Sequence, residues 1–209
     1  MQYDPQIHHR RSIRLKGYDY TQPGAYFVTI CAYQRNEIFG EVVEGEMRLN
    51  RLGEIVREEW LKTAKIRQEV DLHEDEFAIL PNHVHGIIWI VETQSVEATR
   101  GGIESMSVGA TRRVAPTRPV APTIKSHTLV SGSIGAILAQ FKSITAKRIN
   151  AMRDTDAAPV WQRNYYEHII HNENELKNIW NYIDTNPLHW QEDQLHPSAP
   201  PNPFNQDNP

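Results

Sequence analysis

Two histidines one residue apart have the spacing of a metal site. They lie in the segment Leu80-Pro-Asn-His83-Val-His85-Gly-Ile-Ile-Trp-Ile-Val91, whose apolar run predicts a buried strand. Strand side chains alternate between faces, so His83 and His85 project side by side from one face. Their imidazoles could bind one metal ion, or they could be partly buried histidines that hydrogen bonds satisfy. Pro81-Asn82 predicts a bend that places the pair at an end of the sheet.

A second pair of reactive side chains, Tyr182 and Asn186, lies on the last predicted helix. Asn172 and Glu175 have the spacing of a capping box, and Pro187 should end the helix. The apolar stripe comprises Leu176, Ile179, Trp180 and Ile183. Tyr182 and Asn186 are four residues apart and project from one side, on the flank of that stripe. Alone, Tyr182 fits edge packing and Asn186 fits a helix end, but beside the histidine strand they would supply a nucleophile and a third metal ligand.

Tyr165 and Tyr166 are rival nucleophiles, because they are adjacent and close to His168. We rank them lower, since strand geometry directs one of them inward and neither is followed by asparagine four residues later. The outward ring could stack on a base, or it could pack in the core. His168 and His171 have no partner that the sequence indicates.

The elements that should position these side chains are strands and helices of ordinary length. Strands are predicted at 25–33, 76–80, from 83 onward and at 165–170, with 76–80 antiparallel to the histidine strand, and a hairpin at 41–49 should turn at Glu44-Gly45. Asn50 should cap a helix whose apolar face carries Leu52, Ile55, Val56 and Trp60. Ser133 should cap another, with Ile134, Ile137, Leu138, Phe141, Ile144 and Arg148 on one face.

Length and composition limit the class of protein. The chain has 209 residues, of which 39% are hydrophobic, enough for one domain with extensions or two small ones. No stretch approaches the roughly 20 apolar residues of a membrane span. The N-terminus has no apolar signal segment, and the single Cys31 cannot form an internal disulfide. We therefore expect a soluble, cytoplasmic protein without a membrane partner.

Basic residues are segregated along the chain, although the formal net charge is -4. Between Thr99 and Asn150 there are eight basic residues and one acid, Glu104. Such segregation lets one side of a protein hold a phosphate backbone; solvated surface charge is the alternative for any one residue. The candidates for phosphate contacts are Arg10, Arg11, Arg14, Lys16, Lys142, Lys147 and Arg148.

The sequence divides into four parts. A basic arm covers 1–24, a single catalytic-type domain 25–190, and a Pro/Asn/Gln-rich tail 191–209 that we expect to be disordered. Within the domain, 92–132 lacks periodicity and is rich in Gly, Pro, Ser, Thr and Val. This insert is either a flexible basic flap over nucleic acid or plainly disordered.

Four motifs in chain order resemble those of the single-tyrosine HUH transposases, in particular the REP-associated tyrosine transposases. They are Arg10-Arg-Ser-Ile-Arg-Leu-Lys-Gly-Tyr-Asp-Tyr20 with Gly24-Ala-Tyr-Phe-Val-Thr-Ile30, Leu80-Pro-Asn-His-Val-His-Gly86, Trp161-Gln-Arg-Asn-Tyr-Tyr-Glu-His168 and Tyr182-Ile-Asp-Thr-Asn-Pro187. The resemblance covers about residues 10–190 without the insert. It implies an α+β, ferredoxin-like fold: an antiparallel sheet with helices mainly on one face.

The resemblance also implies a chemistry. Tyr182 would be the nucleophile, and His83, His85 and Asn186 would hold Mg²⁺ or Mn²⁺. The activity would be cleavage and transfer of single-stranded DNA through a 5′-phosphotyrosine intermediate, at hairpin-forming repeats, by a monomer or a homodimer. The insert departs from the compact family pattern, which leaves a domesticated relative open.

Two other functions remain open from the sequence. One is a non-catalytic ferredoxin-like module that binds single-stranded nucleic acid, although it would give the histidine pair no task. The other is a metal hydrolase of small phosphoesters, which would give Tyr182 and the basic arm no task.

Overall fold

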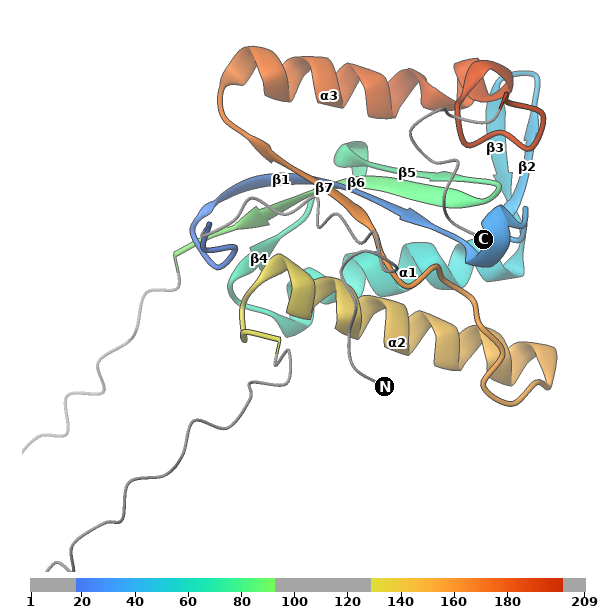
Figure 1. Cartoon of the computed structure of the whole chain (residues 1–209), viewed down its shortest axis with the longest axis horizontal. Coiled ribbons are helices and arrows are strands. Elements are labelled where there is room, and N and C mark those ends of the chain that lie inside the picture. The colour runs from blue at the N-terminus through green and yellow to red at the C-terminus, as the bar shows by residue number, and fades with distance from the viewer. Residues whose placement is uncertain (1–17, 93–128, 201–209) are drawn as a thin grey trace, which may run out of the picture.

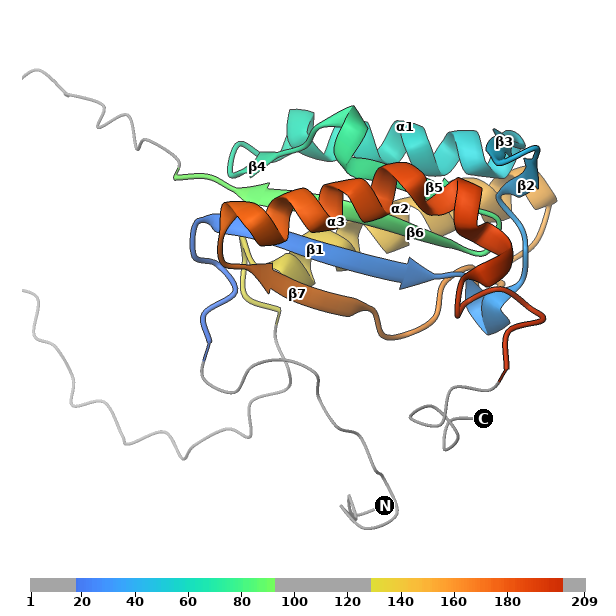
Figure 2. The same cartoon turned by 90° about the horizontal axis from the view of Figure 1, so that it is seen from above.

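The computed structural model describes residues 18–92 and 129–200 (Figures 1 and 2). Four of the predicted phosphate contacts (Arg10, Arg11, Arg14 and Lys16) lie outside the described residues. So do most of the predicted insert and residues 201–209 of the predicted tail. No helix among the described residues is long and apolar enough to cross a membrane.

The described strands form an antiparallel sheet built on two long central strands. β1 (Gly24–Cys31) and β6 (His83–Ile90) pair along their whole length, from Gly24 opposite Ile90 to Cys31 opposite His83. β7 (Tyr166–Ile170) pairs with the other edge of β1, while β4 (Val70–Asp71) and β5 (Phe77–Leu80) both pair with β6. The predicted antiparallel pairing of 76–80 with the histidine strand is therefore confirmed, with Pro81-Asn82 as the turn.

Helices cover both faces of this sheet, but unequally (Figure 1). α1 (Arg51–Ile66) and α2 (Ile134–Arg153) lie on one face, and α3 (Glu173–Thr185) lies on the other. The predicted fold class, α+β with an antiparallel sheet, is therefore confirmed. Two of these three helices lie on one face, as predicted. The predicted 41–49 hairpin is also confirmed, as β2 (Gly40–Val43) and β3 (Glu46–Leu49).

Each predicted helix cap is present. The Asn50 side chain accepts hydrogen bonds from the amides of Leu52 and Gly53, and Ser133 Oγ accepts one from Ala136. Asn172 Oδ1 accepts the amide of Glu175. Such bonds satisfy amides that the first helical turn leaves unpaired. These short polar side chains therefore fix where all three helices begin.

The core is divided by the sheet into a large and a small part. Alternate residues of β1 and β6, such as Val28 and Ile88, pack with Trp60 of α1 and Phe141 of α2 in the large cluster. The residues in between face α3, where the buried cluster is only Ala25, Phe27, Ile87 and Ile183. The face under α1 and α2 thus holds the fold together, while the face under α3 buries far less apolar surface.

The predicted disordered tail is wrong for residues 191–200. α3 ends at Thr185, and the chain continues through Pro187 as the 3-10 helix η3 (Asn186–Glu192). Trp190 is 5% exposed and its ring lies 5.8 Å from that of His83. Backbone bonds from the amides of Asp193, His196 and Ala199 continue the turns. One buried aromatic ring anchors a segment whose Pro/Asn/Gln composition indicated disorder.

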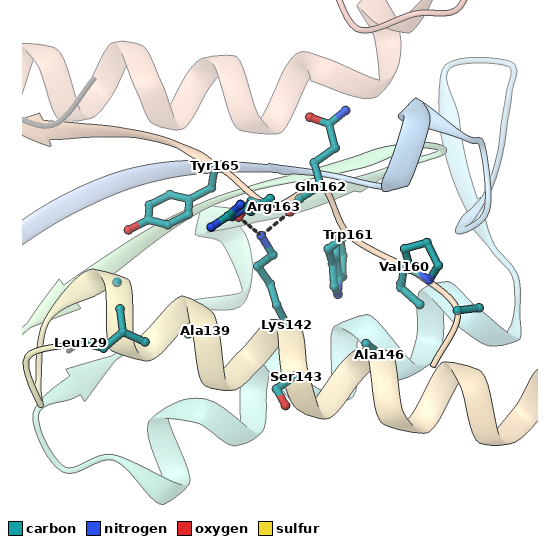
Figure 3. Close-up of a pocket in the computed structure, with 13 residues that line it drawn as sticks. Leu129, Ala139, Lys142, Ser143, Ala146, Val160, Trp161, Gln162, Arg163 and Tyr165 are labelled. Carbon is teal, nitrogen blue, oxygen red and sulfur yellow. Dashed lines mark hydrogen bonds between the residues drawn. The ribbon is translucent and has the colours of Figure 1, made fainter. Parts of the chain in front are cut away.

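Lys142 of α2 holds the segment that leads into β7, shown in Figure 3. Its Nζ donates to the backbone carbonyls of Gln162, Arg163 (3.0 Å) and Asn164 (3.4 Å). Lys142, Gln162 and Arg163 also border a cavity of about 460 Å³ between α2 and this segment, which Tyr165 lines as well. Burial lowers the pKa of Lys142 to about 8. Its polar atoms are used inside the fold, so we do not keep Lys142 as a phosphate contact.

Arg148 of α2 likewise makes contacts within the fold, because it forms ion pairs with the neighbouring helix. Its guanidinium binds Glu58 at 2.7 Å and also Glu59, both on α1. This pairing joins the two helices that cover the large core and gives Arg148 a structural role, while its predicted phosphate contact stays a prediction. Lys147 is exposed on α2 and remains a prediction, although α2 lies on the face opposite α3.

Gly86 should not tolerate a side chain. A Cβ there would lie 2.4 Å from Cζ2 of Trp60, whose ring stacks on Phe77 at 4.4 Å. We expect Gly86→Ala to destabilise the protein by about 1–3 kcal/mol through overpacking, measured by chemical denaturation. A loss below about 0.5 kcal/mol, the usual range for surface substitutions, would show that Trp60 can move aside.

Lys142 and Lys147 form a matched pair on one helix. We expect Lys142→Met to lower the free energy of unfolding by about 1–3 kcal/mol, because it removes hydrogen bonds from a charged donor to three carbonyls. Lys147→Met should change it by less than about 0.5 kcal/mol. Chemical denaturation of both variants checks this, and equal effects would contradict the structural role of Lys142.

Candidate active site

The two histidines of β6 lie side by side on the face that α3 covers. His83 is fully buried and His85 is 2% exposed. Their Nε2 atoms are 2.9 Å apart, because residues i and i+2 of a strand share one face. This confirms the predicted orientation of the pair at the end of β6.

Each imidazole is oriented through its other nitrogen. Asn82 donates its amide hydrogen to the carbonyl of Leu195 (2.8 Å), which leaves its Oδ1 to accept from Nδ1 of His83 at 2.7 Å. Thr29 Oγ1 lies 2.8 Å from Nδ1 of His85. A proton on Nδ1 of both rings leaves both Nε2 lone pairs directed at the same region. Second hydrogen bonds of this kind orient histidines that bind metal.

Burial keeps both imidazoles neutral. It lowers the pKa of His83 to about 3, with a smaller contribution from the charge of Arg35. Burial and the neighbouring His83 hold the pKa of His85 well below its ordinary value. Neutral imidazole is the form that binds a metal ion, so the pair is ready to act as ligands near pH 7.

Tyr182 of α3 reaches this pair within the same chain. Its hydroxyl lies 3.2 Å from Nε2 of His85, and the two rings are 5.1 Å apart. The residue is 43% exposed, so a substrate in solution can contact this tyrosine. Burial and then the charge of Asp193 raise the pKa of Tyr182 to about 12, while a hydrogen bond from Asn186 opposes this. The phenol is therefore protonated at neutral pH.

Asn186 and Asp193 complete the polar surroundings. Asn186 is 3% exposed, and its Nδ2 lies 3.4 Å from Oδ2 of Asp193. Its Oδ1 is buried without a hydrogen-bond partner among the described residues. Ligand atoms of His83, His85 and Asp193 lie within 4.8 Å of one another. An unpartnered buried oxygen costs free energy, and a cation nearby would offset that cost.

These donors fit a divalent cation. Two neutral imidazole nitrogens, a carboxylate and an amide oxygen form a mixed set that suits Mn²⁺ more readily than Mg²⁺, which prefers oxygen. Sequence reasoning missed Asp193, because it lies in the segment assigned to the tail and follows no periodic pattern. It also missed the hydrogen bonds of Thr29 and Asn82, which depend on strand register and on the position of Leu195.

The rival tyrosines lie on opposite faces of the sheet. Tyr165 borders the cavity beside α2, whereas Tyr166 is 48% exposed and its ring lies 6.2 Å from that of Phe27, on the face under α3. His168 bonds Oε1 of Glu175 at 2.6 Å, a partner that the sequence did not indicate. Of the tyrosines that the structure describes, Tyr182 is the one with a recorded hydroxyl contact to the histidine pair.

Comparisons with known proteins place the chain among relatives. No family model matches it. Among solved structures, a REP-associated tyrosine transposase bound to a REP hairpin has a TM-score of 0.52 at 14% identity, covering 87% of this chain and 77% of that one; this likeness shows a shared fold. An uncharacterized protein of Haemophilus influenzae is 38% identical over 194 residues, covering 93% of this chain and 97% of that protein. The chain therefore belongs to the same family as this Haemophilus influenzae protein.

Proposed function

We propose that the protein is a transposase-like enzyme that cleaves and rejoins single-stranded DNA through a covalent 5′-phosphotyrosine link. The observation that carries the proposal is the position of the Tyr182 hydroxyl, 3.2 Å from a buried, neutral imidazole that is paired with a second one. The fold shared with a transposase that binds a REP hairpin supports it. The hairpin preference comes from this likeness and from the sequence motifs.

The reaction would be an in-line displacement at phosphorus. The phenol oxygen of Tyr182 attacks the scissile phosphate, the bond from phosphorus to the 3′ oxygen breaks, and the leaving strand departs with a 3′-hydroxyl. The 5′ phosphate stays on the tyrosine. Because the phosphodiester energy is conserved in this link, a 3′-hydroxyl of another strand can reverse the step and join to it.

The phenol must lose its proton as the new bond forms. Its pKa of about 12 means that spontaneous ionisation near pH 7 is negligible, so a neighbouring group has to take the proton or stabilise the anion. The Asn186 amide favours the anion by donating a hydrogen bond, and the nearby Asp193 carboxylate disfavours it. Asp193 is thus placed to accept the proton unless a cation neutralises its charge.

His83 and His85 would hold a divalent ion, with Asp193 or Asn186 as the third ligand. Bound there, the ion would supply Lewis-acid stabilisation of the charge that develops on the phosphate. Asn186 is the ligand that the sequence motif implies, and Asp193 is the alternative that the geometry adds. Since the tyrosine and both histidines come from one chain, a monomer carries all of these groups.

The decisive experiment traps the covalent intermediate. We expect a hairpin DNA with single-stranded flanks, incubated with the protein and Mn²⁺ or Mg²⁺, to yield a protein-DNA adduct that survives denaturation. The adduct should carry a label on the 3′ end of the DNA but not one on the 5′ end, because the tyrosine keeps the 5′ phosphate. Tyr182→Phe should abolish it, whereas Tyr165→Phe and Tyr166→Phe should still form it.

Other results of this assay would contradict the proposal or favour a different function. Adduct in Tyr182→Phe would refute the assignment of the nucleophile. Binding of DNA by the unmodified protein without any adduct or cleavage would favour a non-catalytic nucleic-acid module. Turnover of a small phosphoester that survives in Tyr182→Phe would favour a metal hydrolase.

Measuring the affinity for Mn²⁺ tests the histidine ligands and decides whether Asn186 or Asp193 is the third ligand. We expect His83→Ala to weaken Mn²⁺ binding by at least about tenfold, measured by calorimetry, and to reduce the rise in melting temperature that bound metal gives. His189→Ala is the matched control, because that imidazole is exposed and pairs only loosely with Glu192, at 3.6 Å. If Asp193 is the ligand, Asp193→Asn should weaken binding more than Asn186→Ala, and the reverse order would assign Asn186.

A further inference from the structure

Tyr166 presents an aromatic ring at the open edge of the sheet, beside the proposed site. It is the first residue of β7, which is an edge strand of the described sheet. In the register of β1 with β7 it lies opposite Thr29, the residue that contacts Nδ1 of His85. Paired residues of neighbouring strands share a face. Tyr166 therefore lies on the same face as the histidines, and Figure 2 shows β7 at the margin of the sheet, beyond α3.

Phe27 connects Tyr166 to the reacting groups. This buried ring lies 5.5 Å from the ring of His85 and 6.2 Å from that of Tyr182. Its distance to the ring of Tyr166 is also 6.2 Å, at an interplanar angle of 68°. Tyr166 and Tyr182 thus contact the same buried ring, while both remain about half exposed. Tyr166 and the proposed nucleophile are therefore two partly exposed tyrosines that border one buried ring.

We propose that Tyr166 is a base-stacking residue, which binds the base of a nucleotide that flanks the scissile phosphate. The proposal rests on the proposed function and adds to it a subsite for the nucleobase. An aromatic ring that packs on Phe27 and is still 48% exposed offers surface to a base, and stacking tolerates every base because each has a π-face. Stacking would hold the strand in place while its phosphate lies at Tyr182.

The recorded contacts distinguish this role from a catalytic one. The hydroxyl contact to the histidine pair belongs to Tyr182, and the contact of Tyr166 recorded in the structure is made by its ring, to Phe27. A stacking residue needs its ring and can lose its hydroxyl, whereas a nucleophile needs the hydroxyl. Tyr166→Phe and Tyr166→Leu separate these two requirements.

The test measures the affinity for single-stranded DNA by fluorescence anisotropy, in a Tyr182→Phe background that prevents covalent trapping. We expect Tyr166→Leu to raise the Kd by roughly 5- to 150-fold, the range for loss of one base-aromatic stack. Tyr166→Phe should stay within about threefold, since it keeps the ring. Thermal unfolding of each variant checks that the fold is retained, and Tyr166→Thr replaces Tyr166→Leu if the latter does not fold.

An abasic scan locates the stacked base. Removing single bases near the cleavage site should weaken binding most at one position in the protein that keeps Tyr166. At that position the same removal should cost nothing further in Tyr166→Leu, because the stack is already lost. Two results would overturn the proposal. One is a Kd for Tyr166→Leu equal to that of Tyr166→Phe. The other is a loss of affinity on base removal that is the same, at every position, in Tyr166→Leu and in the protein that keeps Tyr166.

The adduct assay keeps this proposal separate from the proposed function. With Tyr182 intact, Tyr166→Leu should still form the adduct, but only at higher DNA concentration. An adduct whose dependence on DNA concentration is unaltered in Tyr166→Leu would refute stacking and leave the enzyme. If Tyr166→Leu weakens DNA binding but no variant and no unmodified protein forms the adduct, the proposed enzyme is refuted and the stacking subsite remains.

Discussion

The antiparallel pairing of β1 with β6 is the interaction on which the whole site depends. Its register places Thr29 opposite His85 and Cys31 opposite His83. A slip by one residue would turn every side chain of one strand to the other face. The register is held by the large core, because Val84 and Gly86, which alternate with the histidines along β6, face that core. Val84 belongs to it, and Gly86 lies against Trp60 of α1. Packing on one face thus positions chemistry on the other.

The two faces of the sheet carry different tasks. The face under α1 and α2 buries most of the apolar side chains, and Arg148 and Lys142 add polar links there. The face under α3 buries polar side chains in place of apolar ones, namely those of the two histidines, Thr29 and Asn186. Burying such groups costs free energy unless they are paired, and they are tolerated because the opposite face stabilises the fold.

Local patterns in the sequence predicted the elements and the orientation of the first pair of candidate ligands. The alternation of β6 oriented His83 and His85, and the spacing of α3 put Tyr182 and Asn186 on one flank. These predictions succeeded because strand and helix periodicities depend only on neighbouring residues. The predictions of the helix caps succeeded for the same reason; these caps are Asn50, Ser133 and Asn172.

Features that depend on distant contacts could not be predicted in this way. Asp193 joins the site only because Trp190 packs on His83 and turns the chain back toward β6. Lys142 was predicted to bind phosphate, but the carbonyls that it bonds lie about twenty positions further along the chain. Likewise, the partners of Arg148 lie on another helix. Charge alone does not reveal whether a side chain will face solvent or another element.

The turn after η3 is tied to the histidines by the amide of Asn82, which bonds the Leu195 carbonyl with one atom and His83 with the other. The orientation of an imidazole in the middle of the chain is thus coupled to about ten residues that follow the last helix. Proteolytic trimming before Trp190 would remove the Asp193 carboxylate and release the His83 ring in a single cut. Such a shortened protein would keep its large core, its sheet and its three α-helices, and so could pass for an intact protein in a circular dichroism spectrum.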